Sequence, residues 1–208
     1  INDGSKVMKG DVIAEVSGKT KVLLSGERVS LNILQRLSGI ATLTNMFVEK
    51  VKGLKTKIVD TRKTTPGLRF MEKYAVRVGG GNNHRFGLFD GILIKDNHIE
   101  AVGSITEALR LASEGHHLAK IEVEVENLND LKEAVEGGAD IVMLDNMSIH
   151  DMKEAVNIVR TSKKDVILEA SGNVTIDNVR EVAETGVDLI SIGALTHSAT
   201  AVDISMKI

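Results

Sequence analysis

After residue 53 the sequence alternates between two kinds of segment, short apolar runs and longer helical stretches, and this alternation constrains the fold more than any other feature. Short apolar runs of strand length recur along it as KIVD, GILIK, IEVEVE, DIVMLD, VILEAS and DLISIG. Between them lie stretches of helical length such as NLNDLKEAVEGG, which open on a polar capping residue and close on glycine. Strands that alternate with helices in this way form a parallel sheet with helical crossovers.

The runs fit a βα barrel better than a dinucleotide-binding sheet. The glycine-rich segment at 79–82 reads GGGN and does not match the G-x-G-x-x-G fingerprint of such sheets. We therefore predict an α/β fold whose catalytic barrel covers residues 54–200.

The residues before the barrel follow other patterns. Between 26 and 53, apolar residues recur at steps of three and four, which predicts one long connecting helix that bends at Gly39 and stops at Gly53. Residues 1–25 resemble short strands separated by glycine turns. The chain starts at Ile1 without a leader, so we expect no retained signal peptide and a first domain that lacks its front.

Composition narrows the function. The chain has 208 residues, of which 42% are hydrophobic, and no apolar run approaches the roughly 20 residues that cross a bilayer. A net charge of −3 and an aromatic content of 2% give no reason to expect binding to nucleic acid or membrane. The absence of cysteine excludes disulfides and thiolate chemistry, and favours a cytoplasmic location.

Charged residues and glycines collect where the predicted strands end. In βα barrels the active site lies at the carboxyl ends of the strands. A polar residue at one strand end is common, but a complete set of such ends indicates a site. The ends are Arg62 with Lys63, Lys95, Glu124, Asp145, Ser171 with Gly172, and Gly193.

The stretch IEVEVEN at 121–127 indicates what the barrel encloses. Side chains alternate between the two faces of a strand, so residues two before each strand end point inward, one layer deeper. These residues are Asp60, Leu93, Glu122, Met143, Glu169 and Ser191. A barrel kept only for stability would fill this layer with Val, Ile and Leu. We therefore predict a polar interior, crossed by ion pairs, that serves a polar ligand.

The carboxyl ends of the predicted strands, with the loops that follow them, form a rim, and this rim divides into two halves by charge. Its first half carries Arg62, Lys63, Arg69, His84, Arg85 and Lys95. Such cations suit carboxylates or phosphates, whereas Glu124 and Asp145 suit a divalent ion or sugar hydroxyls. The last two strands end in SGN and IGA, where glycine lets backbone N–H groups approach a phosphate. The pattern predicts one multiply anionic ligand and one phosphorylated sugar.

Long motifs in fixed order resemble the quinolinate phosphoribosyltransferase family, over nearly the whole chain. They are ERVSLNILQRLSGIAT (27–42), DTRKTTPGLR (60–69), GGGNNHRFGLFDGILIKDNH (79–98), EVEVEN (122–127), MLDNM (143–147), LEASGN (168–173) and ISIGALTHS (190–198). The resemblance implies an open six-stranded barrel behind a partial N-terminal α/β sandwich. Residues 1–25 are then the remnant of that sandwich, and residues 201–208 are expected to rejoin it.

The same resemblance implies a reaction. Quinolinate and phosphoribosyl pyrophosphate would give nicotinate mononucleotide, pyrophosphate and CO2 in NAD biosynthesis, with Mg²⁺ and in a homodimer. The residues implied to bind quinolinate are Arg62, His84, Arg85 and Lys95. Those implied to meet the phosphorylated sugar are Lys63 and His197 near the pyrophosphate, and Ser171, Gly172 and Gly193 at the 5′-phosphate.

The remaining implied roles concern catalysis and the dimer. Glu124 and Asp145 would meet the ribose hydroxyls and the metal, and together with Lys63 and Lys95 they are the catalytic candidates. Arg28 would reach into the partner subunit's site. His197 is equally well read as a plain loop histidine.

Two other functions stay open. A phosphoribosyltransferase of the same fold could act on another acceptor, although an acceptor with one carboxylate needs fewer cations than the rim offers. A catalytically silent binding protein is the second alternative, and it would not need both Glu124 and Asp145. The adjacent histidines 116 and 117 suggest a metal site at first sight, but they fall between a helix and a strand at the opposite end of the barrel.

Overall fold

The computed structural model describes residues 1–115, 118–162 and 164–207, and its centre is one parallel sheet. The sheet has the strand order β1-β6-β5-β4-β3-β2, and every pairing between these strands is parallel. The strands are β1 (Lys57–Val59), β2 (Ile92–Ile94), β3 (Ile121–Val125), β4 (Ile141–Asp145), β5 (Ile167–Ser171) and β6 (Leu189–Ser191). All six predicted strands are therefore confirmed, and β1 and β2 form the two edges of an open barrel.

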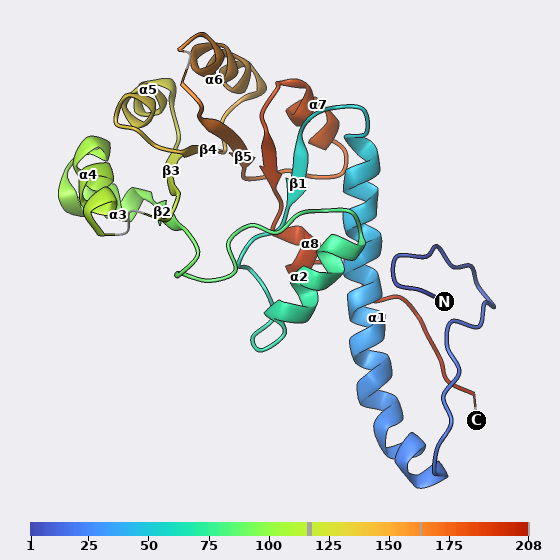
Figure 1. Ribbon diagram of the computed structural model, residues 1–208. Helices are drawn as coiled ribbons and strands as arrows, with labels where there is room; N and C mark the ends of the chain where they lie inside the picture. Colours follow the sequence, from blue (N-terminus) through green and yellow to red (C-terminus); the bar gives the residue numbers. More distant parts are fainter. Residues whose placement is uncertain (116–117, 163, 208) are drawn as a thin grey trace.

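The helices are α1 (Thr20–Lys50), α2 (Arg69–Val78), α3 (Asp96–Val102), α4 (Ile105–Gly115), α5 (Leu128–Glu136), α6 (Ile149–Thr161), α7 (Val179–Glu184) and α8 (Ala194–His197). Helices α4 to α7 lie on the outer face of the curved sheet, whereas α2 and α8 pack beside α1 (Figure 1). Two predicted caps are present: Asn127 accepts the backbone N–H groups of the first turn of α5, and Ser148 does the same for α6.

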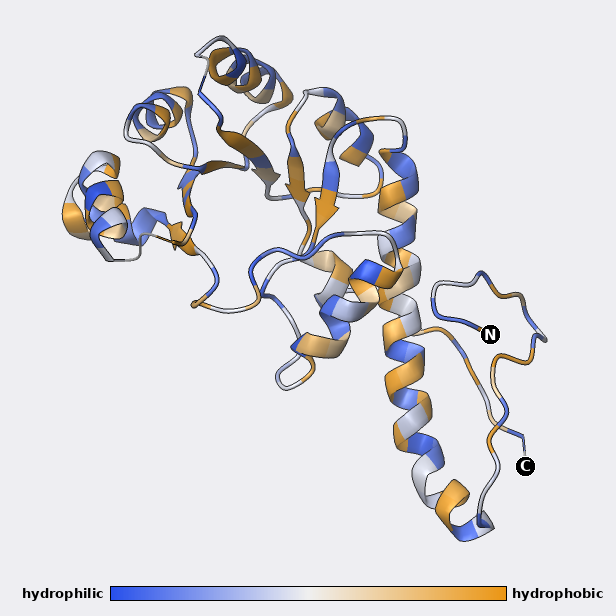
Figure 2. Cartoon of the chain, in the orientation of Figure 1, coloured by the Kyte–Doolittle hydropathy of each residue, from blue (hydrophilic) through white to orange (hydrophobic). Residues whose placement is uncertain are grey.

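The core lies between the sheet and these helices. The residues predicted to face outward from the strands, such as Val123, Leu144 and Leu168, are fully buried against helical residues such as Leu131 and Ala155. Figure 2 shows the same arrangement as apolar strands beneath helices that are apolar on one side. Removing apolar surface from water stabilises a fold by about 25 cal/mol per Å2, so this apolar layer is the main source of stability. The strands are thus fixed by their outer face, which leaves the inner face free for polar residues.

The N-terminal region departs from the predicted pattern. Helix α1 begins at Thr20 rather than at Gly26, and residues 1–19 contain no strand. Val7, Met8, Val12 and Val16 of this segment are exposed. A strand needs a hydrogen-bonding partner, and the described residues place none beside this segment. The division of the chain at residues 25 and 53 remains a prediction.

The C-terminal segment crosses α1 at Gly39. A Cβ atom at Gly39 would lie 2.1 Å from the carbonyl oxygen of Thr200, so the crossing requires glycine. Next to it, the carbonyl of Gln35 accepts the N–H of Val202 at 3.0 Å, and the Gln35 side chain donates to the carbonyl of Ile204 at 2.7 Å. Gly39 therefore marks a close approach of two segments within a continuous helix, not the predicted bend.

Among the described residues, no helix combines the length and hydrophobicity needed to cross a membrane. The histidines at 116 and 117 lie outside the described residues.

Candidate active site

The acidic strand β3 faces the cations, as the alternation of IEVEVEN predicts. The ammonium of Lys95, just after β2, lies 2.5 Å from Oε2 of Glu124, whose side chain is 15% exposed. Glu122 on β3 and Glu169 on β5 are buried on the inner face. Glu122 shares that face because it lies two residues before Glu124 on β3, and Glu169 shares it because it pairs with Met143, which pairs with Glu124. The predicted polar interior is confirmed.

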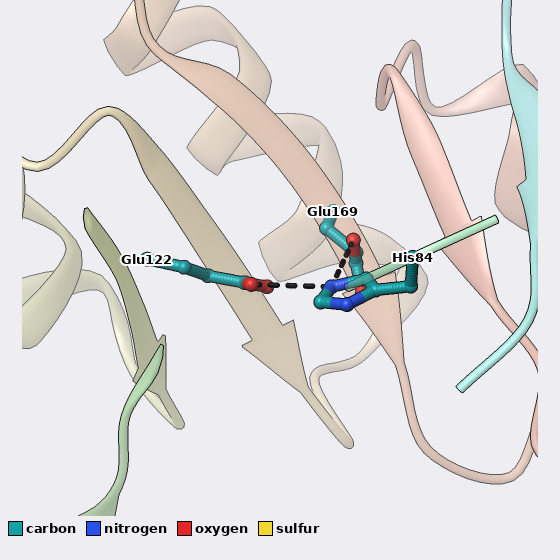
Figure 3. Close-up of side chains that lie close together, drawn as sticks. All are labelled: His84, Glu122 and Glu169. Carbon is teal, nitrogen blue, oxygen red and sulfur yellow. Dashed lines mark ion pairs between the residues drawn. The ribbon is translucent and has the colours of Figure 1, made fainter. Parts of the chain in front are cut away.

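His84 sits over the two buried glutamates (Figure 3). Its Nε2 lies 3.1 Å from Oε2 of Glu122 and 3.4 Å from Oε2 of Glu169. On its other side, Nδ1 accepts the backbone N–H of Arg85 at 2.8 Å. Both ring nitrogens thus have partners inside the protein, and the hydrogen on Nε2 faces the carboxylates.

The charges of this cluster shift each other's pKa values. Burial alone lowers the pKa of His84, but hydrogen bonding of its ring to Glu122 and Glu169 and the charges of these carboxylates outweigh burial and raise the pKa from 6.5 to about 10. Burial raises the pKa of Glu122, and the nearby charge of Glu169 raises it further. A ring protonated on both nitrogens could not accept the N–H of Arg85 at Nδ1, so this hydrogen bond opposes the rise in the pKa of His84. Both observations leave a proton on Nε2, between the ring and the carboxylates.

A buried ion pair fixes the segment that carries His84. The ammonium of Lys73, on α2, contacts Oδ1 of Asp60 and donates to the carbonyl of His84 at 3.0 Å. Asp60 also accepts the backbone N–H of His84 at 2.9 Å and the amide of Asn83 at 2.6 Å. Burial raises the pKa of Asp60, although the hydrogen bond and the charge of Lys73 oppose this. Asp60 was expected inside the barrel, but no pattern in the sequence indicated that Lys73 is its partner.

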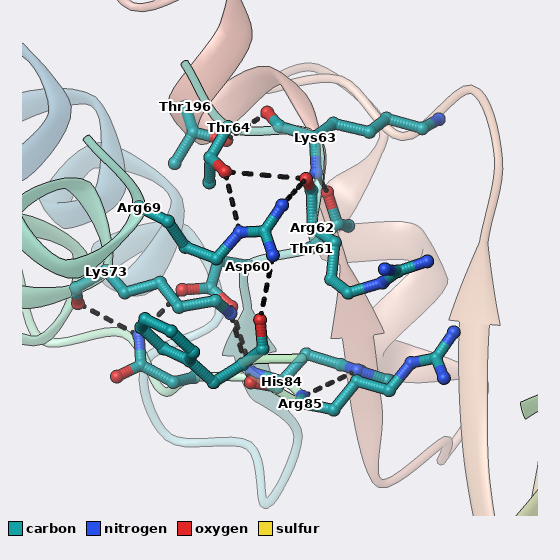
Figure 4. A network of polar contacts seen from close by, with 12 residues as sticks. Asp60, Thr61, Arg62, Lys63, Thr64, Arg69, Lys73, His84, Arg85 and Thr196 are labelled. Atoms are coloured by element: carbon teal, nitrogen blue, oxygen red, sulfur yellow. Dashed lines mark hydrogen bonds and ion pairs between the residues drawn. The ribbon is translucent and has the colours of Figure 1, made fainter. Parts of the chain in front are cut away.

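Arg62 and Arg85 come from different loops and extend toward the same side (Figure 4). Burial and the positive charge of Arg62 lower the pKa of Arg85, so the two guanidiniums interact electrostatically. Arg85 is also held by the carbonyl of Gly91, to which it donates at 3.2 Å. The structure thus brings together the two arginines that the sequence placed in one cationic half.

Asp145 and Ser171 end neighbouring strands at the same level, and their Cα atoms are register partners. Asn146 follows Asp145 with a left-handed φ of 52°, and its amide donates to Oδ2 of Asp145 at 2.8 Å. Gly172 has a φ of 89°, and a Cβ there would lie 2.2 Å from Oδ1 of Asn146. Glycine at 172 is therefore required by both the backbone angle and the space.

Lys63 and His197 meet at Gly193. A Cβ added at Gly193 would lie 3.0 Å from Cδ of Lys63 and 3.2 Å from Nε2 of His197. The hydroxyl of Thr196 donates to the carbonyl of Lys63 at 2.9 Å, which ties α8 to the loop after β1. The residues predicted to meet pyrophosphate and phosphate are therefore neighbours.

A further network that the sequence did not reveal supports the Lys63 loop. Arg36, on α1, donates through Nε to Oε1 of Glu72 at 2.7 Å, and through Nη2 to Thr65 Oγ1 at 2.9 Å and the Thr196 carbonyl at 2.8 Å. Glu72 is fully buried. The spacing of apolar residues in α1 predicted only its apolar contacts, and no pattern in the sequence showed that Arg36 points inward.

Arg28 lies away from these groups. Its side chain is 70% exposed, and its ion-pair partner among the described residues is the adjacent Glu27, at 3.9 Å. Within this chain, therefore, Arg28 does not join the cluster formed by the other candidates.

Two acidic sets could hold a cation. Among the described residues, donor atoms of His84, Glu122 and Glu169 lie within 4.8 Å of one another. The hydrogen on Nε2 of His84 occupies that space, so a metal there would have to displace it. Glu124 and Asp145 offer hard oxygen donors at neighbouring strand ends, although Lys95 contacts one oxygen of Glu124.

Comparison with known proteins decides the family. The model of the quinolinate phosphoribosyl transferase C-terminal domain matches residues 40–207, and that of the N-terminal domain matches residues 1–38. The chain belongs to the quinolinate phosphoribosyltransferase family. Membership in this family accounts for the open barrel and for α1, where the two matched domains meet.

Relatives in the family cover the whole chain. The chain is 51% identical to the probable nicotinate-nucleotide pyrophosphorylase [carboxylating] of Bacillus subtilis, over 99% of its own length and 71% of that protein. It is 47% identical to the protein of the same description from Synechocystis, over 99% of its own length and 70% of that protein. The crystal structure of NadC from Streptococcus pyogenes superimposes with a TM-score of 0.94 at 46% identity, covering 100% of this chain and 72% of that one.

Proposed function

We propose that this chain transfers the phosphoribosyl group of phosphoribosyl pyrophosphate to quinolinate with loss of CO2, giving nicotinate mononucleotide and pyrophosphate for NAD biosynthesis. Membership in the family supports this reaction. The observation that carries it is the arrangement of charge: Arg62 and Arg85 extend to the same side (Figure 4), and Lys95 contacts Glu124 at the end of β3. An acceptor with two carboxylates and a sugar with several phosphates repel one another, so a site for both must supply cations to each.

In this proposal the cationic half binds and orients quinolinate. Arg62 and Arg85 bind its carboxylates, because planar guanidiniums recognise carboxylates in a bidentate manner. Lys95 adds a third charge beside Glu124. His84 supports the same half from below, since its ring faces Glu122 and Glu169. Holding the ring nitrogen in line with the sugar carbon it attacks lowers the entropic part of the barrier.

The other half binds the sugar phosphate. Ser171, Gly172 and Gly193 meet the 5′-phosphate through backbone N–H groups that glycine leaves accessible, and Lys63 and His197 lie near the pyrophosphate. As pyrophosphate leaves, the ribose carbon develops positive charge, which Glu124 or Asp145 stabilises. After transfer the ring nitrogen is quaternary and withdraws electrons, so decarboxylation at the neighbouring carbon needs no nucleophile from the protein.

Mg²⁺ fits the residues at the ends of β3 and β4. Asp145 has a described partner for Oδ2 only, from Asn146, which leaves Oδ1 for another ligand within the described part of the chain. Glu124 and Asp145 would hold the ion together with substrate oxygens, as Mg²⁺ prefers. When bound, the ion supplies positive charge that makes pyrophosphate a better leaving group.

The enzyme acts as a cytoplasmic homodimer in this proposal. Arg28 supports the dimer, because its side chain is exposed and its ion pair within the described part of the chain is the long contact with Glu27, so it can reach a second copy. The absence of cysteine from the sequence supports a reducing compartment.

Turnover by the purified chain tests the proposal. We expect release of CO2 from carboxyl-labelled quinolinate when phosphoribosyl pyrophosphate and Mg²⁺ are present, with stoichiometric nicotinate mononucleotide, and none when either substrate is omitted. Nicotinate, which has one carboxylate, should react poorly. Efficient reaction with nicotinate would indicate a related transferase with another acceptor. Tight quinolinate binding without any product would indicate a silent binding protein.

A further inference from the structure

The two loops that carry Arg62 and Arg85 lie on the open side of the barrel. Strands β1 and β2 are the edges of the sheet, and in the described chain they are not paired with each other. The segment before β2 touches β1 through one isolated bridge, between Val59 and Asn82, and Asp60, just after β1, accepts from Asn83 and His84. Elsewhere in the barrel, neighbouring loops are set apart by the fixed spacing of paired strands. Here the distance between the loops depends largely on side-chain contacts.

The two loops also carry charges that oppose their approach. Both guanidiniums extend to the same side (Figure 4), and burial together with the charge of Arg62 lowers the pKa of Arg85, as expected from a repulsion between like charges. Without an anion between them, this repulsion favours conformations in which the loops separate. A site that is ready for an acid with two adjacent carboxylates must hold the guanidiniums close before the acid arrives.

Arg69, the first residue of α2, bridges the two loops (Figure 4). On the Arg62 side, its Nη2 donates to the carbonyl of Arg62 at 3.2 Å and its Nε to Thr64 Oγ1 at 2.9 Å. On the Arg85 side, its Nη1 donates to the carbonyl of Phe86 at 3.0 Å. The guanidinium of Arg69 thus joins the carbonyl of Arg62 to the carbonyl of Phe86, the residue that follows Arg85.

The sequence suggested a different role for Arg69, as one more cation of the rim. In the structure each of its three nitrogens donates to a protein acceptor, and two of these acceptors are main-chain carbonyls. A lysine has one nitrogen and cannot span the same three acceptors.

We propose that Arg69 is a positioning residue that sets the spacing of Arg62 and Arg85 and so determines affinity for an acceptor with two carboxylates. This rests on the proposed function, in which these arginines bind quinolinate. Arg69 acts through the two loops and does not touch the acceptor. Its loss therefore weakens recognition of two carboxylates together and leaves the phosphate half unchanged.

Steady-state kinetics of Arg69→Met and Arg69→Lys test this role, with Arg110→Met as the matched control. Arg110 is an exposed arginine on α4 whose partners are Glu107 and Glu114, remote from the rim. We expect Arg69→Met to raise the KM for quinolinate about tenfold or more, since charged hydrogen bonds are lost. The KM for phosphoribosyl pyrophosphate should stay within about twofold of wild type, and Arg69→Lys should rescue little of the loss. Arg110→Met should match wild type for both substrates.

A second variant and a rescue experiment cover the case in which Arg69→Met does not fold. Thr64→Val removes one acceptor and keeps the arginine, so the KM for quinolinate should rise in the same direction by about threefold. In Arg69→Ala, millimolar methylguanidinium should restore part of the quinolinate affinity, whereas methylammonium should not.

Three results would overturn the inference. They are an unchanged KM for quinolinate in the folded Arg69→Met and Thr64→Val variants, an equal rise for both substrates, or full activity in Arg69→Lys, which would make Arg69 a simple cation. Failure of the proposed function looks different, because the wild-type chain would then form no nicotinate mononucleotide at all.

Discussion

The cations of the active site lie on the loops after β1 and before β2, and at Lys95 just after β2. The loops after β4 to β6 carry its glycines and small polar residues. The two sets are held in place by different means. Charged side chains hold the first set: Lys73 anchors Asp60 and the His84 segment, and Arg69 joins the two loops. Backbone conformation holds the second set, with left-handed φ angles of 52°, 89° and 50° at Asn146, Gly172 and Asn173.

The difference follows from what each half binds. Cationic side chains repel each other, so they need counter-charges and clamps beneath them before an anion arrives. A phosphate held by backbone N–H groups needs only a chain that bends correctly, which glycine and asparagine allow. Damage to the first half should therefore cost stability and acceptor affinity, whereas damage to the second should cost affinity for the sugar phosphate.

The largest effect should come from breaking the buried ion pair. Lys73→Met leaves the Asp60 carboxylate buried with only neutral donors, so we expect a loss of about 3–5 kcal/mol in the free energy of unfolding. Urea denaturation followed by circular dichroism measures it. The double variant Lys73→Met with Asp60→Asn should recover part of the loss, because the unpaired charge is gone. A loss below about 1 kcal/mol in the single variant, as for an exposed pair, would contradict this anchoring role.

The next effect should separate the two substrates. Lys95→Ala removes the ammonium that faces Glu124, and a charged hydrogen bond is worth about 1.5–3 kcal/mol, so quinolinate affinity should fall about tenfold to a hundredfold. Calorimetric titration of each substrate compares the two halves directly. Phosphoribosyl pyrophosphate should bind with little change. An equal loss for both substrates would mean that Lys95 does not belong to the acceptor half.

Gly172→Ala should show the reverse preference. A left-handed backbone costs a residue with a Cβ about 1–2 kcal/mol, and this Cβ would lie 2.2 Å from Oδ1 of Asn146. The loop must shift, so phosphoribosyl pyrophosphate should bind about tenfold more weakly while quinolinate affinity stays the same. Gly10, also at positive φ but with open space around it, gives the control Gly10→Ala, which carries the backbone cost alone. If Gly172→Ala leaves both affinities unchanged, the phosphate does not bind at this loop.

The sequence predicted some parts of the active site in more detail than others. Strand alternation placed Glu122 and Glu169 inside correctly, because a period of two decides which face a side chain joins. It did not reveal the partner of Asp60 or the bridging role of Arg69. Those depend on how α2 sits across the open side of the barrel, and helical periodicity reports burial but not which buried charges meet. The strands expected before residue 20 did not form, since alternation alone supplies no partner strand.

The smallest effect should come from Asn146, and it tests whether backbone or side chain holds the phosphate half. Its side chain donates to Asp145 and accepts from Asn173 at 2.8 Å each, and both contacts are exposed. Asn146→Gly loses these bonds, worth about 0.5–1.5 kcal/mol at most, but it relieves a left-handed φ that glycine adopts without cost. We expect these changes to offset, leaving the free energy of unfolding within about 0.5 kcal/mol of wild type. Asn146→Ala loses the same bonds without that relief, so it should be less stable than Asn146→Gly by about 1 kcal/mol. If the two variants are equally destabilised, side-chain hydrogen bonds hold this half as well, and the contrast between the halves disappears.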